Sequence, residues 1–322
     1  MQLSHACAAG LLAMAATCTA VAAESFPAKP VRLIVPFPAG GGGDSAARLL
    51  VQELSMRIGQ QVVVDNRGGA GGLIGMEIVK NALPDGYTVL LSTAGFVAMP
   101  ALHKRLPFDP ARDFTGVITA LSGAYILVVH PGSPFKSVTA LIAYAKANPG
   151  KLDYASAGNG STIHLAGELF KNMAQINWVH VPYKGAGPAL TDVIGRQVKS
   201  MFASATNGLP MIKSGKLRAL AVTSAKRSSL ARELPTIAES GLPGFEVTGW
   251  YGIAAPVQTP RFIVARLNAE VNHVLRLPEL AERLPAQGLE IVGGIADAAT
   301  ALIKGDVARW ISVLRDAGLK QE

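Results

Sequence analysis

A strand, a glycine-rich loop and a helix follow one another in the stretch VRLIVPFPAGGGGDSAARLL, residues 31–50. Residues 31–35 are apolar at four of five positions, which indicates a buried strand. From Ser45 to Ile58 apolar residues return at helical spacing. A strand that runs through a short loop into a helix is the start of a parallel βαβ unit. The stretch therefore predicts an α/β fold.

The same alternation of short strands and helices continues along the chain. Further strands are predicted at 61–64, 87–92, 117–130, 152–156, 178–181, 198–203, 217–223 and 247–255, and further helices at 72–81, 138–146, 161–173, 189–194, 206–213, 262–275 and 296–317. Ser122-Gly123 interrupts the run 117–130 and predicts a break there. The pattern gives two α/β blocks, joined by extended crossings near 120–128 and 247–255.

The composition is that of a globular protein and excludes extended disorder. Of the 322 residues, 49% are hydrophobic and 16% are charged. The 30 Lys and Arg exceed the 22 Asp and Glu by 30 − 22 = 8, a balance that favours an anionic ligand or partner. The basic residues are scattered, with no Lys/Arg block or zinc-finger spacing, so no nucleic-acid binding is predicted.

The N-terminus has the pattern of a secretory signal peptide over residues 1–23. Residues 6–23 carry no charge and end in Val21-Ala22-Ala23, which suits signal-peptide cleavage. The first five residues lack the usual Lys or Arg, and the alternatives are a membrane anchor or a lipid-modified Cys18. Since Cys7 and Cys18 are the two cysteines, cleavage leaves no thiol nucleophile, cysteine metal site or disulfide. We expect a soluble protein outside the cytoplasmic membrane.

The loop 36–45 is suited to binding an anion. Its four consecutive glycines, 40–43, let backbone N–H groups converge, and the helix that follows favours negative charge at its N-terminus. No Gly-Lys-Ser/Thr follows, so the loop is not a P-loop. Asp44 and Ser45 have a structural interpretation, in which one of them caps the helix and Asp44 pairs with Arg48.

Two further glycine-rich loops raise enzymatic alternatives. In 66–75, Gly69, Gly71 and Gly75 fit a loose dinucleotide pattern, but no acidic residue clearly ends the next strand to hold a ribose. In 154–164, Ser161 and His164 are three residues apart, which keeps a serine hydrolase open as an alternative. The nucleophile-elbow pattern Gly-x-Ser-x-Gly is missing, however. The histidines show no metal-ligand spacing, and no metal or cofactor is predicted.

Six short motifs, in this order, carry a resemblance to a known family. They are Val35-Pro36-Phe37-Pro38-Ala39-Gly40-Gly41; Asn66-Arg67 with Gly69-Ala70-Gly71-Gly72; Asp85-Gly86-Tyr87; Tyr154-Ala155-Ser156-Ala157-Gly158 with Gly160-Ser161 and His164; Val181-Pro182-Tyr183-Lys184-Gly185; and Leu234-Pro235-Thr236 with Glu239 and Gly241. From about Lys29 to the C-terminus the chain resembles the Bug, or TctC, family. These proteins are the extracytoplasmic solute receptors of tripartite tricarboxylate transporters.

The resemblance implies a periplasmic binding protein fold of the second type, an α/β fold with two domains, two crossing strands and a ligand cleft between the domains. Domain 1 would comprise 24–125 and 250–322, and domain 2 would comprise 126–249. The implied function is non-enzymatic capture of a small carboxylate, an organic acid or acidic amino acid, often through ordered water. The implied partners are the membrane permease subunits of such a transporter, with a sensor kinase as the alternative. The expected protein is a periplasmic monomer without cofactors.

Carried onto this sequence, the resemblance also implies a set of cleft residues. They are Phe37, Pro38, Ala39, Gly40, Thr93, Ala94, Ser156, Gly160, Ser161 and Ser204. The hydrolase alternative would use Ser161 or Ser204 as its nucleophile. Two positions depart from the family pattern, because Gly68 stands where proline is frequent and Gly43 where a hydroxyl residue is common. Backbone contacts from the first loop are therefore expected more than side-chain contacts.

Overall fold

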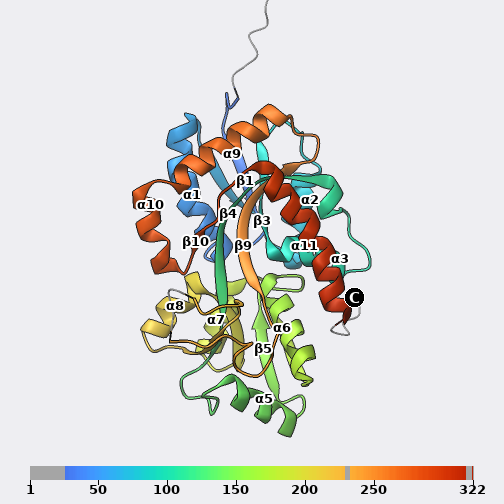
Figure 1. Ribbon diagram of the computed structural model, residues 1–322, viewed down its shortest axis with the longest axis vertical. Coiled ribbons are helices and arrows are strands. Elements are labelled where there is room, and N and C mark those ends of the chain that lie inside the picture. Colours follow the sequence, from blue (N-terminus) through green and yellow to red (C-terminus); the bar gives the residue numbers. More distant parts are fainter. Residues whose placement is uncertain (1–25, 229–232, 317–320, 322) are drawn as a thin grey trace, which may run out of the picture.

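The computed structural model describes residues 26–228, 233–316 and 321. These residues form two α/β blocks that follow one another along the long axis of the molecule (Figure 1). The first block is the upper one in this view, and the second block, which contains α5 at its lower end, is the lower one. The predicted signal peptide, residues 1–23, lies outside the described residues.

The first block is built on a mixed sheet with the strand order β2-β1-β3-β9-β4. The first three strands are parallel, and β9 runs antiparallel to both β3 and β4. Its elements are β1 Val31–Val35, α1 Gly42–Ile58, β2 Val62–Asn66, η1 Ala70–Gly72, α2 Leu73–Lys80, β3 Thr88–Thr93, α3 Ala94–Leu102, α4 Pro110–Asp113, β4 Phe114–Val129, β9 Thr248–Pro256, α9 Arg261–Leu275, α10 Pro278–Arg283, η2 Pro285–Gln287, β10 Glu290–Ile291 and α11 Ala296–Asp316.

β1 is apolar on both faces because helices cover both. Leu33 and Val35 share one hydrophobic cluster with Leu50 of α1 and Val271 of α9. The intervening Ile34 faces the opposite way, into a cluster with residues of α2, α3 and α11. Successive side chains of a strand point to opposite faces, so a doubly covered strand buries apolar residues on both, and in β1 only Arg32 is exposed.

The second block carries parallel strands with helices between them. β5 pairs in parallel with β6 and β7, while β4 runs antiparallel to β7 and β8. Phe170, Trp178, Phe202 and Phe245 form an aromatic cluster at its centre, with ring centroids 4.9–6.3 Å apart. Burial of each ring stabilises the fold by roughly 1.5–3 kcal/mol. The elements are α5 Val138–Ala147, β5 Leu152–Ser156, α6 Thr162–Ala174, β6 Trp178–Pro182, α7 Ala186–Ile194, β7 Ser200–Ser204, α8 Ala205–Lys213 and β8 Arg218–Val222.

One strand, β4, belongs to both blocks. Up to Ala124 it pairs with β9, and from Tyr125 onward it pairs with β7 and β8. The predicted break at Ser122-Gly123 is wrong, because the strand continues through both residues. A Cβ atom on Gly123 would lie 2.9 Å from the carbonyl oxygen of Gly288, so glycine serves close packing there. The predicted domain limits, 24–125 with 250–322 and 126–249, stay predictions.

Several helices differ from the sequence-based expectation, and the short helices α4 and α10 have no predicted counterpart. α1 begins at Gly42, three residues before the predicted Ser45, so that half of the glycine run is helical. α3 has no predicted counterpart, because every residue but one is buried and the helix has no polar face to give a period.

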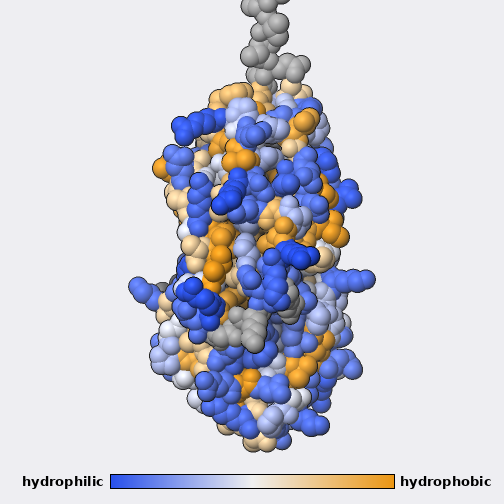
Figure 2. Space-filling view, turned by 90° about the vertical axis from the view of Figure 1, so that its right-hand side faces the viewer, coloured by the Kyte–Doolittle hydropathy of each residue, from blue (hydrophilic) through white to orange (hydrophobic). Residues whose placement is uncertain are grey.

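Within the described residues, no helix combines the length and apolar character needed to cross a membrane. Hydrophilic residues cover most of the face in Figure 2.

Candidate functional site

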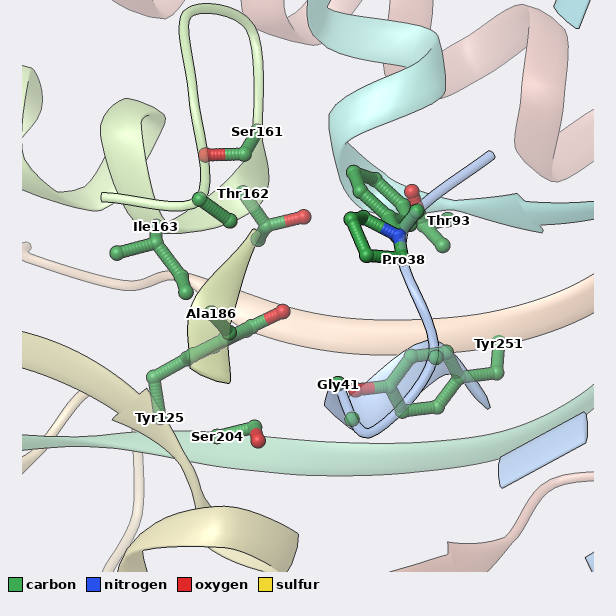
Figure 3. A pocket seen from close by; sticks show the side chains of 14 residues that line it. Pro38, Gly41, Thr93, Tyr125, Ser161, Thr162, Ile163, Ala186, Ser204 and Tyr251 are labelled. Carbon is green, nitrogen blue, oxygen red and sulfur yellow. The ribbon is translucent and has the colours of Figure 1, made fainter. Parts of the chain in front are cut away.

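A cavity of about 40 Å³ lies where the two blocks meet. Both blocks contribute to its wall, as Figure 3 shows. The lining residues are Phe37, Pro38, Gly41, Gly42, Gly43, Thr93, Tyr125, Ala157, Ser161, Thr162, Ile163, Ala186, Ser204 and Tyr251. None of these fourteen residues carries a charged side chain. A volume of this size holds only one or a few water molecules.

The N-termini of five helices contribute residues to this cavity. Gly41 is the N-cap of α1, Thr93 of α3, Ser161 of α6 and Ser204 of α8, and Ala186 is the first residue of α7. The first backbone N–H groups of a helix have no acceptor within it, and the helix dipole adds partial positive charge at that end. These helix ends therefore favour a negatively charged group in the cavity, although no cationic side chain lines it.

The first turn of α1 leaves its N–H groups available. Gly41 makes no side-chain cap to the helix. Asp44 instead accepts hydrogen bonds from the Gly40 N–H and from Nε of Arg48, each at 3.0 Å. Although burial raises its pKa, the hydrogen bonds from Arg48, Gly40 and Asn66 bring the pKa of Asp44 below its usual value. The predicted Asp44–Arg48 pair is confirmed, whereas the predicted cap by Asp44 or Ser45 is wrong.

Two serine hydroxyls face the cavity from the second block. Ser161 Oγ accepts the backbone N–H of His164 at 3.2 Å, so its own hydrogen can point to a ligand. Ser204 Oγ is fully buried and has no hydrogen-bond partner among the described residues. A buried hydroxyl without a partner costs stability, and a ligand oxygen placed beside it would remove that cost.

Two tyrosines complete the wall. In Figure 3 the side chains of Tyr125 and Tyr251 enter from opposite sides with their hydroxyl groups pointing inward. Burial is the main cause that raises the pKa of both phenols, and it outweighs the hydrogen bond from Thr162, which lowers the pKa of Tyr125. The two hydroxyls also share a hydrogen bond, which lowers the pKa of Tyr125 and raises that of Tyr251. Both phenols are protonated at neutral pH.

Contacts across the blocks describe a closed cleft. Asn207 of α8 donates to the carbonyl oxygen of Gly40 at 3.3 Å, and Thr206 donates to that of Gln287 at 3.0 Å. A Cβ atom on Gly71 would lie 1.5 Å from the carbonyl oxygen of Asn159, so the backbones of two glycine-rich loops touch. Because the cavity is small, we expect the blocks to separate when a carboxylate larger than a few waters enters.

The structure brings half of the predicted cleft residues into the cavity wall. Phe37, Pro38, Thr93, Ser161 and Ser204 line it, and Ala39, Gly40, Ala94, Ser156 and Gly160 do not. Ser156 is fully buried and its Oγ lies 2.6 Å from Nε2 of His180. Gly40 turns at a φ of 83° and holds Asp44 through its N–H group. Ligand contact by all ten residues stays a prediction.

The predicted cleft residues do not include Tyr125 or Tyr251, whereas Gly42 lies in the glycine run 40–43 that was predicted to bind an anion through its backbone. Gly42 needs its missing side chain, because a Cβ atom there would lie 2.7 Å from Ser204 Oγ and 2.9 Å from the Tyr251 hydroxyl. Tyr125 and Tyr251 lie on the two crossing strands. Tyrosines within these otherwise mainly aliphatic strands are a signal that could have singled them out.

Within the described part of the chain, neither Ser161 nor Ser204 has the imidazole partner that the hydrolase alternative needs. Ser161 contacts His164 through the backbone N–H of that residue, and Nδ1 of the imidazole accepts from the Gly160 N–H at 3.1 Å. A nucleophilic serine needs an imidazole nitrogen to take its proton. The Ser156–His180 pair has that contact but is not part of the cavity wall.

Among the described residues, no group of three or more His, Cys, Asp or Glu side chains could hold a metal ion.

Comparison with known proteins identifies similar chains. Residues 46–319 match the sequence model of the TctC family, described as the tripartite tricarboxylate transporter family receptor. Protein BugT of Bordetella pertussis is 38% identical over 313 residues, which cover 96% of this chain and 95% of BugT.

Two solved structures from Rhodopseudomonas palustris have the same fold. Rpa4515 with adipate has a TM-score of 0.88 at 38% identity, over 92% of this chain and 100% of that one. MatC with bound malate has a TM-score of 0.85 at 32% identity, over 90% of this chain and 100% of that one.

Proposed function

Because the chain belongs to the TctC family of solute-binding receptors, we propose that it captures a small carboxylate in the cleft between its two α/β blocks. The receptor then delivers this ligand to the permease subunits of a tripartite tricarboxylate type transporter in the membrane. The proposed location is the periplasm, reached through the signal peptide at residues 1–23.

One observation carries this proposal, namely the convergence of five helix N-termini on a cavity without charged side chains. First-turn N–H groups and helix dipoles favour an anion, and no residue of the cavity wall supplies an opposing negative charge. The hydroxyls of Ser161, Ser204, Tyr125 and Tyr251 add neutral donors around the same space. Such donors suit a carboxylate better than a cation or an apolar solute.

The ligands of related structures support the same chemical class. Rpa4515 was solved with adipate and MatC with malate, and both ligands are small carboxylates. Charge-assisted hydrogen bonds to a carboxylate contribute about 1.5–3 kcal/mol each. A few of them provide micromolar affinity without an arginine.

A thermal-shift screen tests the proposal with matched pairs of compounds. The mature chain is heated with organic acids and acidic amino acids, and with the neutral amide of each acid, for example adipate beside adipamide. We expect one or a few carboxylates to raise the unfolding temperature in a concentration-dependent way, and their amides to have no effect. Stabilisation by the amides alone, or by cations alone, would contradict the proposal, and turnover of a stabilising ligand would restore the hydrolase alternative.

A further inference from the structure

A second cavity lies in the second block, away from the cleft. Its volume is about 160 Å³, and it lies between the turn after β4, helix α5 and the turn after α7. β4 links the two cavities, because Tyr125 lines the cleft and His130, five residues later, lines this cavity. Five residues of extended chain span ~17 Å. The helix α7 likewise has Ala186 at the cleft and ends close to this cavity.

The wall of this cavity combines aromatic rings with cationic side chains. Phe135 and Tyr144 form an edge-to-face pair with ring centroids 4.9 Å apart. Arg196 and Lys199 contribute the positive charge. Asp153 accepts from Nζ of Lys199 at 3.0 Å and from its backbone N–H, so that carboxylate is already occupied. No acidic residue lines the cavity.

A hydrogen bond to His130 positions the exposed Arg196 side chain, and two backbone features accompany it. Its backbone φ of 61° is in the left-handed region, which residues other than Gly and Asn seldom adopt. Its Nε donates to Nδ1 of His130 at 3.0 Å. Gly132 leaves room for the guanidinium, because a Cβ atom there would lie 2.7 Å from Nη2 of Arg196.

The fixed guanidinium keeps its outer donors available. His130 Nδ1 accepts from both Arg196 and the Gly132 N–H, and burial followed by the charges of Arg196 and Arg218 lowers the pKa of this imidazole. Of the residues that the structure describes, none accepts a hydrogen bond from Nη1 or Nη2 of Arg196. A guanidinium edge with two free nitrogens matches the two oxygens of a carboxylate.

We propose that this cavity is a second ligand site, which binds a small aromatic carboxylate with the carboxylate on Arg196 and the ring against Phe135 and Tyr144. A cavity of ~150 Å³ is large enough to hold a benzene ring. Glycine at position 196 would adopt the left-handed conformation at a lower free-energy cost than arginine does. The arginine is therefore less stable in this turn than glycine would be, but it supplies an anion-binding group at a defined position.

Titration of the mature chain with benzoate, followed by NMR of the His130 imidazole, tests this second site. His130→Gln identifies the resonance by its disappearance. We expect benzoate to shift the His130 signal saturably in the millimolar range, and benzyl alcohol, which lacks the charge, to bind at least tenfold more weakly. Ser204→Ala should leave the His130 response unchanged, so the result does not depend on the cleft.

Arg196→Gly separates binding from folding. Glycine suits the left-handed turn, so the variant should unfold at the same or a higher temperature than the wild type and bind benzoate at least tenfold more weakly. Gln197→Ala, in the same turn but outside the cavity wall, should bind like the wild type. Equal affinity of the wild type and Arg196→Gly would overturn the proposal. So would a His130 shift that sodium chloride reproduces at the same ionic strength, or no shift up to the solubility limit of benzoate.

Discussion

Gly42 and Ser204 face each other across the cleft, and a Cβ atom on Gly42 would lie 2.7 Å from Ser204 Oγ. Gly42 is the first residue of α1 in the first block, and Ser204 is the N-cap of α8 in the second. Real Cβ atoms essentially never come this close to an oxygen, so a side chain at position 42 would have to displace the Ser204 and Tyr251 hydroxyls or separate the blocks. The pair therefore links a sequence feature, the glycine run, to closure of the two blocks.

Gly42→Ala should keep the cleft from closing while the chain still folds. The new methyl group would contact Ser204 Oγ and the Tyr251 hydroxyl, which separation of the blocks relieves. We expect a larger radius of gyration by small-angle scattering and at least tenfold weaker carboxylate binding by calorimetry. Gly187→Ala is the matched control, since a Cβ atom there meets nothing within 4 Å. Unchanged affinity in Gly42→Ala would show that the ligand does not need this closure.

Ser204→Ala should change ligand binding, whereas Ser156→Ala should change the stability of the fold. Ser204 Oγ has no hydrogen-bond partner among the described residues, so its removal should weaken carboxylate binding by one to two decades and leave the free energy of unfolding unchanged or slightly higher. Ser156 Oγ contacts His180 and accepts the Gly158 N–H at 3.1 Å, so its removal should lower the free energy of unfolding by about 1–3 kcal/mol. Calorimetry and urea unfolding of both variants measure the two effects. Loss of stability without loss of binding in Ser204→Ala would remove this residue from the site.

Arg48→Ala should leave carboxylate binding within threefold of the wild type. The guanidinium is 56% exposed and its Nε is engaged by Asp44, so it offers no anchor to a ligand in the cleft. The lost ion pair should lower the free energy of unfolding by about 0.5 kcal/mol. Arg67→Ala, which breaks a pair with Asp65, is a comparable control. If calorimetry showed that Arg48→Ala alone abolishes binding, the ligand would be bound by an arginine and not by the neutral donors proposed here.

His180 should make the protein sensitive to acid. Burial, followed by the nearby charges of His164 and Lys171, lowers the pKa of His180 to about 3. An unfolded histidine titrates near ~6.5, so between these values the unfolded state binds a proton that the folded state does not. The contribution of neutral His180 to the free energy of unfolding is therefore complete above about pH 6.5 and is lost as the pH falls toward 3.

His180→Phe removes this titration and retains an aromatic ring beside Tyr154, whose centroid lies 4.9 Å from that of His180. Urea unfolding between about pH 6 and pH 4 should show a shallower loss of stability in the variant, by about 1 kcal/mol per pH unit. Parallel slopes for the two proteins would show that His180 does not cause the acid sensitivity.

Local patterns predicted the strands and amphipathic helices because each pattern has its own period. β1 and its loop could be assigned from residues 31–45 alone. α3 could not, because a helix buried on nearly all sides has no polar face. The start of α1 was placed too late, since glycine has low helix propensity and the reason for Gly42 lies in Ser204, 162 residues away in sequence.

The candidate site was predictable where it lies on strand-to-helix loops. Phe37 and Ser161 follow strands and Thr93 is the last residue of one, and the carboxyl ends of strands form the usual ligand crevice of an α/β sheet. Tyr125 and Tyr251 lie within strands, and only the pairing of β4 with both blocks brings their hydroxyls together. That contact depends on tertiary structure, so the sequence could draw attention to each tyrosine but could not place the two side by side.

A crystal structure of the complex with the most stabilising carboxylate tests the central proposal most directly. We predict a carboxylate group within hydrogen-bond distance of Ser204 Oγ and of first-turn N–H groups of α1 and α6, directly or through one water, with no Lys or Arg side chain in contact. A carboxylate bound by a Lys or Arg side chain, or bound only outside the cavity between the blocks, would contradict it.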